Sequence, residues 1–404
     1  MKVYLVGGAV RDQLLGYPHH EKDWVVVGAS PDELLAQGFQ QVGRDFPVFL
    51  HPKTKEEYAL ARLERKQAPG YHGFSCDFSK EVTLVDDLKR RDLTINAMAL
   101  DEQQRLIDPY QGKKDLDNKI LRHVSSAFAE DPVRVLRIAR FAARYHYLGF
   151  KLASETQSLI YNMVLSKELE SLVAERVWQE WQKSLSERNP EIFIQILRDC
   201  GALSIILPEI DALFGIPNPK QYHKEIDSGV HSLLVLQQAV ILSESPEVRF
   251  AALLHDLGKT VTPQKIWPKH HRHEENGLKL IESLCARLRI PNDYRKLALL
   301  ASKYHLTIHR FFELKASTIV RTLEETDAFR RPSLFMDLLR VAEADARGCL
   351  KPVDYKQALM WQDVLKLCSK ITAKPFIEKG LKGEAIKNEL HMARVDACKQ
   401  FLNK

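Results

Sequence analysis

Residues 5–12 read Leu-Val-Gly-Gly-Ala-Val-Arg-Asp, a short apolar run that ends in two glycines and is followed by an arginine and an aspartate. A strand that ends in glycines lets backbone N–H groups approach a phosphate closely, and the N-terminus of the next helix attracts anions. Gly16 is expected to end that helix. Taken alone, the same residues also fit a simple tight turn between a strand and a helix.

Two spaced acids follow this turn. Glu21 and Asp23 lie just before the β-rich run Trp24 to Val27, and in an extended chain they fall on the same side. Their carboxylates suit Mg²⁺, and two such ions can activate a 3′-hydroxyl and stabilise a departing pyrophosphate. The alternative is a solvated acidic turn on the surface.

Two arginine-rich motifs lie farther along the chain. Residues 90–97 read Arg-Arg-Asp-Leu-Thr-Ile-Asn-Ala, and adjacent arginines are natural clamps for phosphate oxygens. Asp131 is expected to cap a helix with Pro132 in its first position. The arginines of that helix share one face, either as a basic solvated surface or as a wall of a nucleotide site: Arg134, Arg137, Arg140 and Arg144.

Asp131 and Arg134 suggest a way to select bases. Cytosine and adenine both pair an amino donor with a ring-nitrogen acceptor, so an aspartate can accept from the first while an arginine donates to the second. Guanine and uracil present the opposite pattern. We therefore expect this pair to admit C and A and to refuse G and U.

Histidines gather in the second half of the chain. Eight of the fifteen lie between residues 223 and 309, more than chance placement predicts. Imidazole and carboxylate together suit a transition metal that activates water for hydrolysis. His255-Asp256 is the pair that we interpret as metal-binding, whereas helix or surface histidines without a ligand role are the preferred interpretation of His270, His271 and His309.

The N-terminal motifs together resemble those of the bacterial CCA-adding enzymes, which belong to the polymerase-β-like nucleotidyltransferase superfamily, in the class that also holds bacterial poly(A) polymerase. They occur in the family's order within the first 145 residues, and the similarity continues along the chain. The region of His231 and His255-Asp256 resembles the HD phosphohydrolase superfamily. Its signature closes with a later aspartate, for which Asp345 is one candidate.

This resemblance implies template-independent addition and repair of the 3′-terminal CCA of tRNA from CTP and ATP, with release of pyrophosphate. It implies a nucleotide site formed by Gly8, Arg11, Arg91, Asp131, Arg134, Arg137 and Arg140. It also implies catalytic Mg²⁺ at Glu21 and Asp23. The family usually has aspartate at both metal positions, so we expect Glu21 to ligate with altered geometry.

For the HD region the resemblance implies phosphatase, 2′-nucleotidase and 2′,3′-cyclic phosphodiesterase activity with a transition metal such as Ni²⁺. Its catalytic residues would be His255 and Asp256, and His231, His273 and His305 would be further metal ligands. Hydrolysis there could trim damaged tRNA ends before extension.

The expected fold is an α/β head, with the mixed sheet and helices of the polymerase-β-like nucleotidyltransferases, followed by an all-α neck, HD domain and tail. The predicted boundaries are 1–125 for the head, 126–218 for the helical neck with nucleotide- and tRNA-binding surfaces, 219–346 for the HD domain and 347–404 for the tail. Gly215 to Lys220, which contains two prolines, is the expected linker.

Composition agrees with this interpretation without requiring it. Basic residues exceed acidic ones by six, which permits a nucleic-acid partner such as tRNA. The six cysteines include no pair with metal-knuckle spacing, so reduced thiols in the cytoplasm are expected. No apolar stretch reaches the length of a membrane span. The chain is expected to act as a monomer or homodimer.

Three alternatives remain open. A poly(A) polymerase would share the N-terminal motifs, although the His-Asp region and the motif beginning at Gly7 argue against it. An HD phosphohydrolase with a degenerate, RNA-binding head would not need the intact set of glycines, acids and arginines. A non-catalytic tRNA-binding protein would show no Mg²⁺-dependent turnover.

Overall fold

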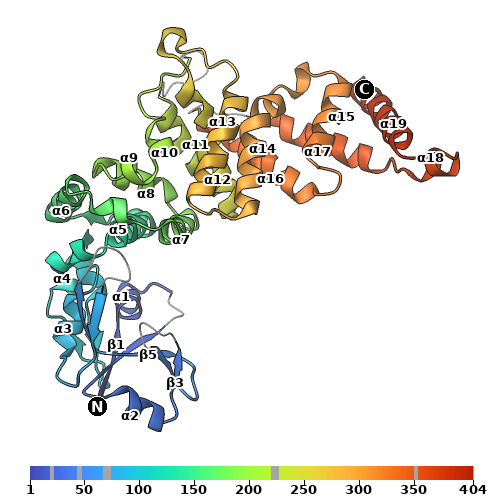
Figure 1. The fold of residues 1–404 in the computed structure, drawn as a ribbon. Helices are drawn as coiled ribbons and strands as arrows, with labels where there is room; N and C mark the ends of the chain where they lie inside the picture. Colours follow the sequence, from blue (N-terminus) through green and yellow to red (C-terminus); the bar gives the residue numbers. More distant parts are fainter. Residues whose placement is uncertain (19–21, 43–47, 67–73, 220–226, 350–353, 404) are drawn as a thin grey trace. The chain divides into compact units, whose positions relative to one another are not determined.

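The computed structural model describes residues 1–18, 22–42, 48–66, 74–219, 227–349 and 354–403 (Figure 1). By its internal contacts the chain divides into two compact units, Met1–Ile206 and Leu207–Lys404. The first unit holds an α/β portion followed by helices, and the second is helical throughout its described part. The predicted fold class is confirmed.

A seven-stranded mixed sheet forms the centre of the first unit, in the order β3-β4-β5-β2-β1-β8-β9. β2 and β5 are parallel, and the other neighbouring pairs are antiparallel. The strands are β1 (Lys2–Val6), β2 (Asp23–Val27), β3 (Gln40–Val42), β4 (Val48–Leu50), β5 (Glu57–Leu60), β8 (Ala99–Leu100) and β9 (Leu106–Ile107).

The apolar residues of β2 explain why the sheet is covered on both faces. Successive side chains of a strand point to opposite faces. Val25 packs in one core cluster with Leu88 of α3 (Leu84–Lys89). Val26 packs in another with Leu34 of α2 (Pro31–Ala36). A slip of one residue would exchange the two faces, so this pattern fixes the register in which Val6 of β1 faces Asp23 of β2.

Helices complete the first unit. α1 (Gly8–Leu15) follows β1 directly and ends at Gly16, as predicted. α5 (Val133–Tyr145) is buried along most of its length and packs against α7 (Ala174–Leu185) and α8 (Pro190–Asp199). The remaining helices of this unit are α4 (Gly112–Asp117), α6 (Ser154–Leu165) and α9 (Leu203–Ile206).

The second unit is built around α11 (Ser228–Leu242), α12 (Pro246–Leu254), α14 (Asn292–His309) and α16 (Pro332–Gly348), which pack against one another. α13 (His273–Arg287) packs against α14. The other helices are α10 (Pro208–Asp211), α15 (Ala316–Glu325), α17 (Lys356–Ser369), α18 (Lys374–Glu378) and α19 (Glu384–Leu402). No helix in the described ranges is long and apolar enough to cross a membrane.

Several details differ from the sequence-based expectations. Short pairs of strands form outside the main sheet: β6 (Leu63–Lys66) with β7 (Phe74–Asp77), and β10 (Ile120–Leu121) with β11 (Lys151–Leu152). β10 and β11 have two residues each, too few to carry a periodicity that a sequence reading can detect. Along the chain, the boundary between the two units falls between Ile206 and Leu207. The expected linker therefore lies inside the second unit, where Asn218 is buried. The four-part division of the chain stays a prediction.

Candidate active sites

The first candidate site begins at the turn between β1 and α1. Gly7 has a φ of +72°, and a Cβ at this position would lie 2.8 Å from Arg91 Nη1. A side chain here would be strained by the positive φ, and the end of the Arg91 side chain would have to shift to admit it. Gly7 and Gly8 line a pocket next to the N-terminus of α1, where backbone N–H groups favour an anion.

Asp23 lies beside this turn. It opens β2 opposite Val6, and its Oδ2 is 4.0 Å from the position that a Cβ of Gly7 would take. Its side chain lines the same pocket. Glu21 lies outside the described residues, so its predicted partnership with Asp23 stays a prediction.

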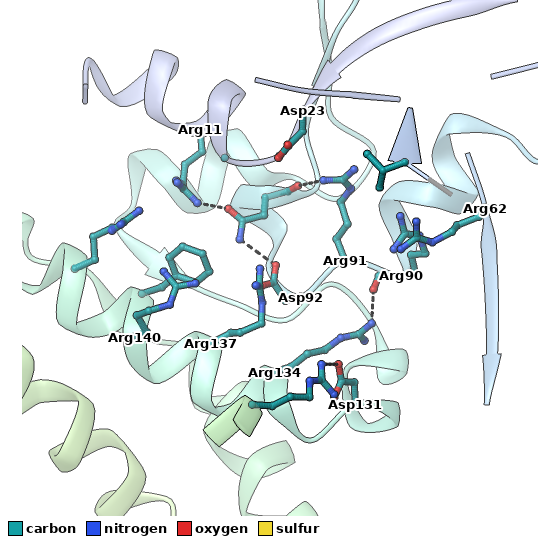
Figure 2. A pocket seen from close by; sticks show the side chains of 17 residues that line it. Arg11, Asp23, Arg62, Arg90, Arg91, Asp92, Asp131, Arg134, Arg137 and Arg140 are labelled. Atoms are coloured by element: carbon teal, nitrogen blue, oxygen red, sulfur yellow. Dashed lines mark hydrogen bonds and ion pairs between the residues drawn. The ribbon is translucent and has the colours of Figure 1, made fainter. Parts of the chain in front are cut away.

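The pocket is strongly cationic. It has a volume of about 590 Å³, and its wall includes nine arginines against three aspartates (Figure 2). All seven residues predicted to bind the nucleotide line it: Gly8, Arg11, Arg91, Asp131, Arg134, Arg137 and Arg140. The other arginines of the wall are Arg62, Arg90, Arg144 and Arg176. A multiply charged anion such as a triphosphate fits this excess of positive charge.

A buried network holds several of these arginines in place. Asp92 accepts hydrogen bonds from Arg137 Nε at 2.7 Å and from Asn96 Nδ2 at 2.9 Å. Asn96 Oδ1 in turn accepts from Arg11, which also makes a two-point ion pair with Asp12. Burial raises the pKa of the Asp92 carboxyl, but Arg137 and Asn96 more than offset this and hold it well below its usual range. Asp92 is therefore ionised at neutral pH.

Asp87 forms ion pairs with two more arginines of the pocket, Arg90 and Arg91. Its side chain is fully buried and lies 2.7 Å from Arg90 Nη2 and 3.1 Å from Arg91 Nη2. Burial raises the pKa of Asp87, yet these two guanidinium groups lower it below its usual value. The carboxylate therefore fixes the direction in which Arg91 extends toward Gly7.

Replacing Asp87 by Asn is expected to lower the free energy of unfolding by about 3 kcal/mol at neutral pH, because it removes a fully buried carboxylate that pairs with two partly buried guanidinium groups. Since folding lowers the pKa of Asp87, its contribution is present above its unfolded pKa and is lost as pH falls through its folded pKa. Urea unfolding at several pH values measures both effects. Asp117→Asn, which removes an exposed pair with Lys113, is the control and should cost under about 1 kcal/mol. Equal losses in both variants would contradict this role.

The predicted base-selecting pair, Asp131 and Arg134, lines the pocket, and each of the two side chains has other partners. Arg134 donates to the carbonyl oxygens of Ala127 and Arg90. The Asp131 carboxylate accepts from both Nη atoms of Arg176, at 3.0 and 2.8 Å. It also accepts from Val133 N, the first residue of α5. The N-cap of α5 is Pro132, so the helix begins one residue later than predicted and Asp131 precedes the cap. Sequence reasoning missed Arg176 because nothing in the pattern of α7 links it to a residue 45 positions earlier.

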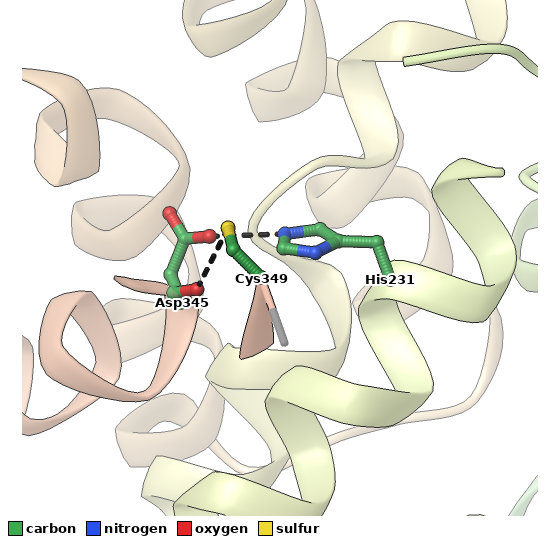
Figure 3. A group of neighbouring side chains, drawn as sticks. All are labelled: His231, Asp345 and Cys349. Carbon is green, nitrogen blue, oxygen red and sulfur yellow. Dashed lines mark hydrogen bonds and ion pairs between the residues drawn. The ribbon is translucent and has the colours of Figure 1, made fainter. Parts of the chain in front are cut away.

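The second candidate site is a buried histidine–aspartate cluster in the second unit. His231 Nε2 lies 2.9 Å from Asp345 Oδ1 (Figure 3), and His255 Nε2 lies 3.3 Å from Asp256 Oδ2. His273 Nε2 lies 3.3 Å from Asp256 Oδ1 and 3.2 Å from His305 Nε2. All five residues predicted for this centre are thus neighbours, and Asp345 joins them.

Backbone carbonyls orient the imidazoles. Nδ1 of His255 lies 2.8 Å from Ala252 O, and Nδ1 of His273 lies 2.8 Å from His270 O. His305 Nδ1 is 3.0 Å from Ala301 O. An Nδ1–H that donates to a carbonyl leaves the Nε2 lone pair facing the cluster. His255 Nε2 is buried and faces carboxylate oxygens of Asp256 and Asp345, as a metal ligand in this cluster would.

The donor set divides into groups that suit a metal ion. His231, His255 and Asp256 form one group, and Asp256, His273 and His305 form another, each with its ligand atoms within 4.8 Å of one another. Cys349 forms a third group with His231 and Asp345. Imidazole and carboxylate ligands favour transition metals over Mg²⁺ or Ca²⁺. The residues present therefore fit the predicted metal centre.

Three further polar residues adjoin the cluster. Lys259 Nζ lies 2.6 Å from Asp256 Oδ2 and 2.9 Å from Asn218 Oδ1. His309 Nε2 lies 2.8 Å from Asp345 Oδ2. The spacing of His305 and His309, four residues apart on one helix, was the available signal for His309. The interpretation of His309 from the sequence, as a helix or surface histidine without a ligand role, stays a prediction.

The chain matches three domain families. They are described as the Poly A polymerase head domain, over residues 3–122, as "Probable RNA and SrmB- binding site of polymerase A", over 149–214, and as the HD domain, over 229–331. The head match covers Gly7 to Arg91, and the HD match covers His231 to His309. Asp345 lies beyond it.

Curated relatives match along nearly the whole chain. The "Multifunctional CCA protein" of Legionella pneumophila (strain Lens) is 65% identical, and the match covers 98% of this chain and 97% of the relative. The "Multifunctional CCA protein" of Vibrio campbellii is 54% identical over the full length of both. Among solved structures, the Bacillus stearothermophilus CCA-adding enzyme in complex with CTP superposes with a TM-score of 0.65 at 23% identity, covering 98% of this chain and 89% of that one.

Proposed function

This chain belongs to the family of multifunctional CCA proteins, and on that premise we propose that it adds the 3′-terminal CCA to tRNA from CTP and ATP and releases pyrophosphate. One observation carries the proposal: Asp23, the Gly7-Gly8 turn and nine arginines meet at a single pocket in the first unit. A polymerising enzyme needs these three elements to hold a metal-bound triphosphate.

The residues of the head divide the work of nucleotidyl transfer. The Gly7-Gly8 turn and the N-terminus of α1 receive phosphate oxygens, and Arg91 and Arg137 neutralise their charge. Glu21 and Asp23 would hold Mg²⁺, which when bound supplies charge neutralisation and alignment of the tRNA 3′-hydroxyl with the transferred phosphate. Asp92 and Asp87 keep the arginines fixed, so that little reorganisation accompanies the reaction.

Base selection would use Asp131, Arg134 and a residue absent from the sequence-based proposal, Arg176. Because Arg176 already occupies the Asp131 carboxylate, an incoming cytosine or adenine must share or displace this pair before its amino group can donate to Asp131. A carboxylate offers lone pairs for more than one donor, so sharing is chemically feasible.

Asp131→Ala is expected to reduce discrimination against GTP and UTP about 10- to 100-fold, since one base-edge contact is worth about 1–3 kcal/mol. Competition between labelled nucleotides on tRNA that lacks its CCA end measures the ratio. Glu187→Gln is the matched control, because it removes the acid that pairs with Arg144 in the same wall. Unchanged selectivity in Asp131→Ala would eliminate the base-reading role.

For the second unit we propose a metal-dependent phosphohydrolase with phosphatase, 2′-nucleotidase and 2′,3′-cyclic phosphodiesterase activity. The HD family match and the buried cluster support it. His231, His255, Asp256, His273 and His305 would hold a transition metal such as Ni²⁺, which when bound supplies Lewis acidity for phosphoester cleavage. Lys259 balances the charge of Asp256. A cytoplasmic location and a monomeric or dimeric state stay predictions.

Incubation of tRNA lacking its CCA end with labelled CTP and ATP, with and without Mg²⁺, tests the main proposal. The expected product is longer by C, C and A, and it forms only with Mg²⁺. Long tails that need no CTP would identify a poly(A) polymerase instead. Hydrolysis without any incorporation would identify a phosphohydrolase with a degenerate head, and tRNA binding without any turnover would identify a binding protein.

A further inference from the structure

His309 differs from the other histidines of the cluster in what its ring contacts. Its Nε2 lies 2.8 Å from Asp345 Oδ2, and its Nδ1 lies 2.8 Å from the hydroxyl of Tyr355. Side chains therefore engage both ring nitrogens, whereas His255, His273 and His305 each turn Nδ1 to a backbone carbonyl and Nε2 to the cluster. His309 is placed beside the metal ligands and is not itself arranged as one.

The two hydrogen bonds of the His309 ring have the same direction, from donor to acceptor. An ionised carboxylate only accepts, so the proton between His309 and Asp345 belongs to Nε2. In the neutral ring Nδ1 then accepts the hydroxyl proton of Tyr355, which is buried. The chain of hydrogen bonds is Tyr355 to His309 to Asp345.

Because of these hydrogen bonds, the two carboxylate oxygens of Asp345 have different partners. Oδ1 lies 2.9 Å from His231 Nε2 and 3.6 Å from His255 Nε2, at the metal-binding cluster. Oδ2 is held by His309 on the other side. Rotation of the carboxylate would break one of these contacts, so His309 fixes which oxygen faces the metal.

The same contacts connect α14 to α17. Tyr355 directly precedes α17, and within α17 Gln357 Nε2 donates to His309 O at 3.2 Å and Trp361 Nε1 donates to Ile308 O at 3.0 Å. Three side chains of the segment after residue 354 thus hold the end of α14. This segment and Asp345 both lie beyond the HD family match, which ends at residue 331.

We propose that His309 and Tyr355 are positioning residues that hold Asp345 in its ligating orientation, so that α17 forms part of the phosphohydrolase centre. The proposal rests on the metal centre assigned above. Hydrogen-bond partners of metal ligands typically change metal affinity by about 10- to 100-fold when removed.

The test is Ni²⁺ binding by isothermal titration calorimetry to the untagged full-length chain, with excess Mg²⁺ to occupy the head. Tyr355→Phe removes only the hydroxyl and should weaken Ni²⁺ binding about 10-fold, whereas His309→Ala should approach 100-fold. His309→Gln, which can donate to Asp345 and accept from Tyr355, should restore much of the affinity. Tyr304→Phe is the control, because Tyr304 lies on α14 as His309 does and its hydroxyl donates to Glu325 of α15.

Asp345→Ala and His255→Ala separate failure of this proposal from failure of the metal centre. If both abolish Ni²⁺ binding while Tyr355→Phe and His309→Ala bind as tightly as the parent, the positioning role is overturned and the centre stands. If Asp345→Ala and His255→Ala bind Ni²⁺ normally, the centre itself is wrong. Thermal unfolding of Tyr355→Phe should match that of Tyr304→Phe, which separates lost affinity from lost folding.

Discussion

Asp23→Asn is expected to slow incorporation of CMP and AMP by about a thousand-fold, because a metal ion at the reacting phosphate contributes several kcal/mol and each 1.36 kcal/mol is a factor of ten. Asp23 is the described acid nearest the Gly7 turn, and asparagine keeps its size while removing its charge. Initial rates with labelled CTP and tRNA lacking its CCA end measure the effect. Added Mg²⁺ should restore little of the rate.

Asp32→Asn provides the comparison for this variant. Asp32 is an exposed acid in the first turn of α2, away from the pocket lining, so its replacement should leave incorporation unchanged. Cleavage of 2′,3′-cyclic phosphates should continue in both variants, because the histidine cluster lies in the other unit. Full incorporation by Asp23→Asn would remove the catalytic role of this acid and the main support for the proposed polymerisation.

The second large effect is expected at His255. Its replacement by Ala removes a buried imidazole whose Nε2 faces the carboxylates of Asp256 and Asp345. It should reduce the hydrolysis of 2′,3′-cyclic AMP to about a hundredth of the parent rate or less. CCA addition should persist, since every described residue of the nucleotide pocket belongs to the first unit. Parallel assays of both activities on one preparation give the comparison.

His271→Ala is the matched control, because this histidine is exposed and only two residues from the cluster member His273. It should keep both activities. Joint loss of hydrolysis and CCA addition in His255→Ala would mean that the two centres depend on each other. Unimpaired hydrolysis would mean that the cluster does not carry the activity.

The features that the sequence predicted correctly are those set by residues close together along the chain. Gly7 and Gly8 predicted a strand, a turn and a helix, and the positive φ at position 7 explains why glycine is favoured there. The arginines of α5 were predicted to share a face because their spacing follows the helical repeat, and they do line one pocket. The fold class followed from the same motifs together with the helical periodicity after Asp131.

Partnerships across long separations escaped prediction. Arg176 holds Asp131 from 45 residues away, and Tyr355 reaches His309 from 46 residues away. Asp345 was one candidate among later aspartates until the packing of α16 against α11 brought it to His231. Sequence periodicity shows which face of a helix is apolar, but it does not show which other helix covers that face.

The histidine–aspartate centre draws its residues from four helices and from the segment that follows α12, and 114 positions separate His231 from Asp345 along the chain. In an unfolded chain these groups are too scattered to share one ion, so binding is linked to folding. An ion present at 100 times its dissociation constant adds about 2.7 kcal/mol to the stability of the state that binds it. A metal ion bound at this centre would therefore help to hold Leu207–Lys404 together, and a cell that runs short of it would lose this unit to unfolding and proteolysis sooner than the first unit.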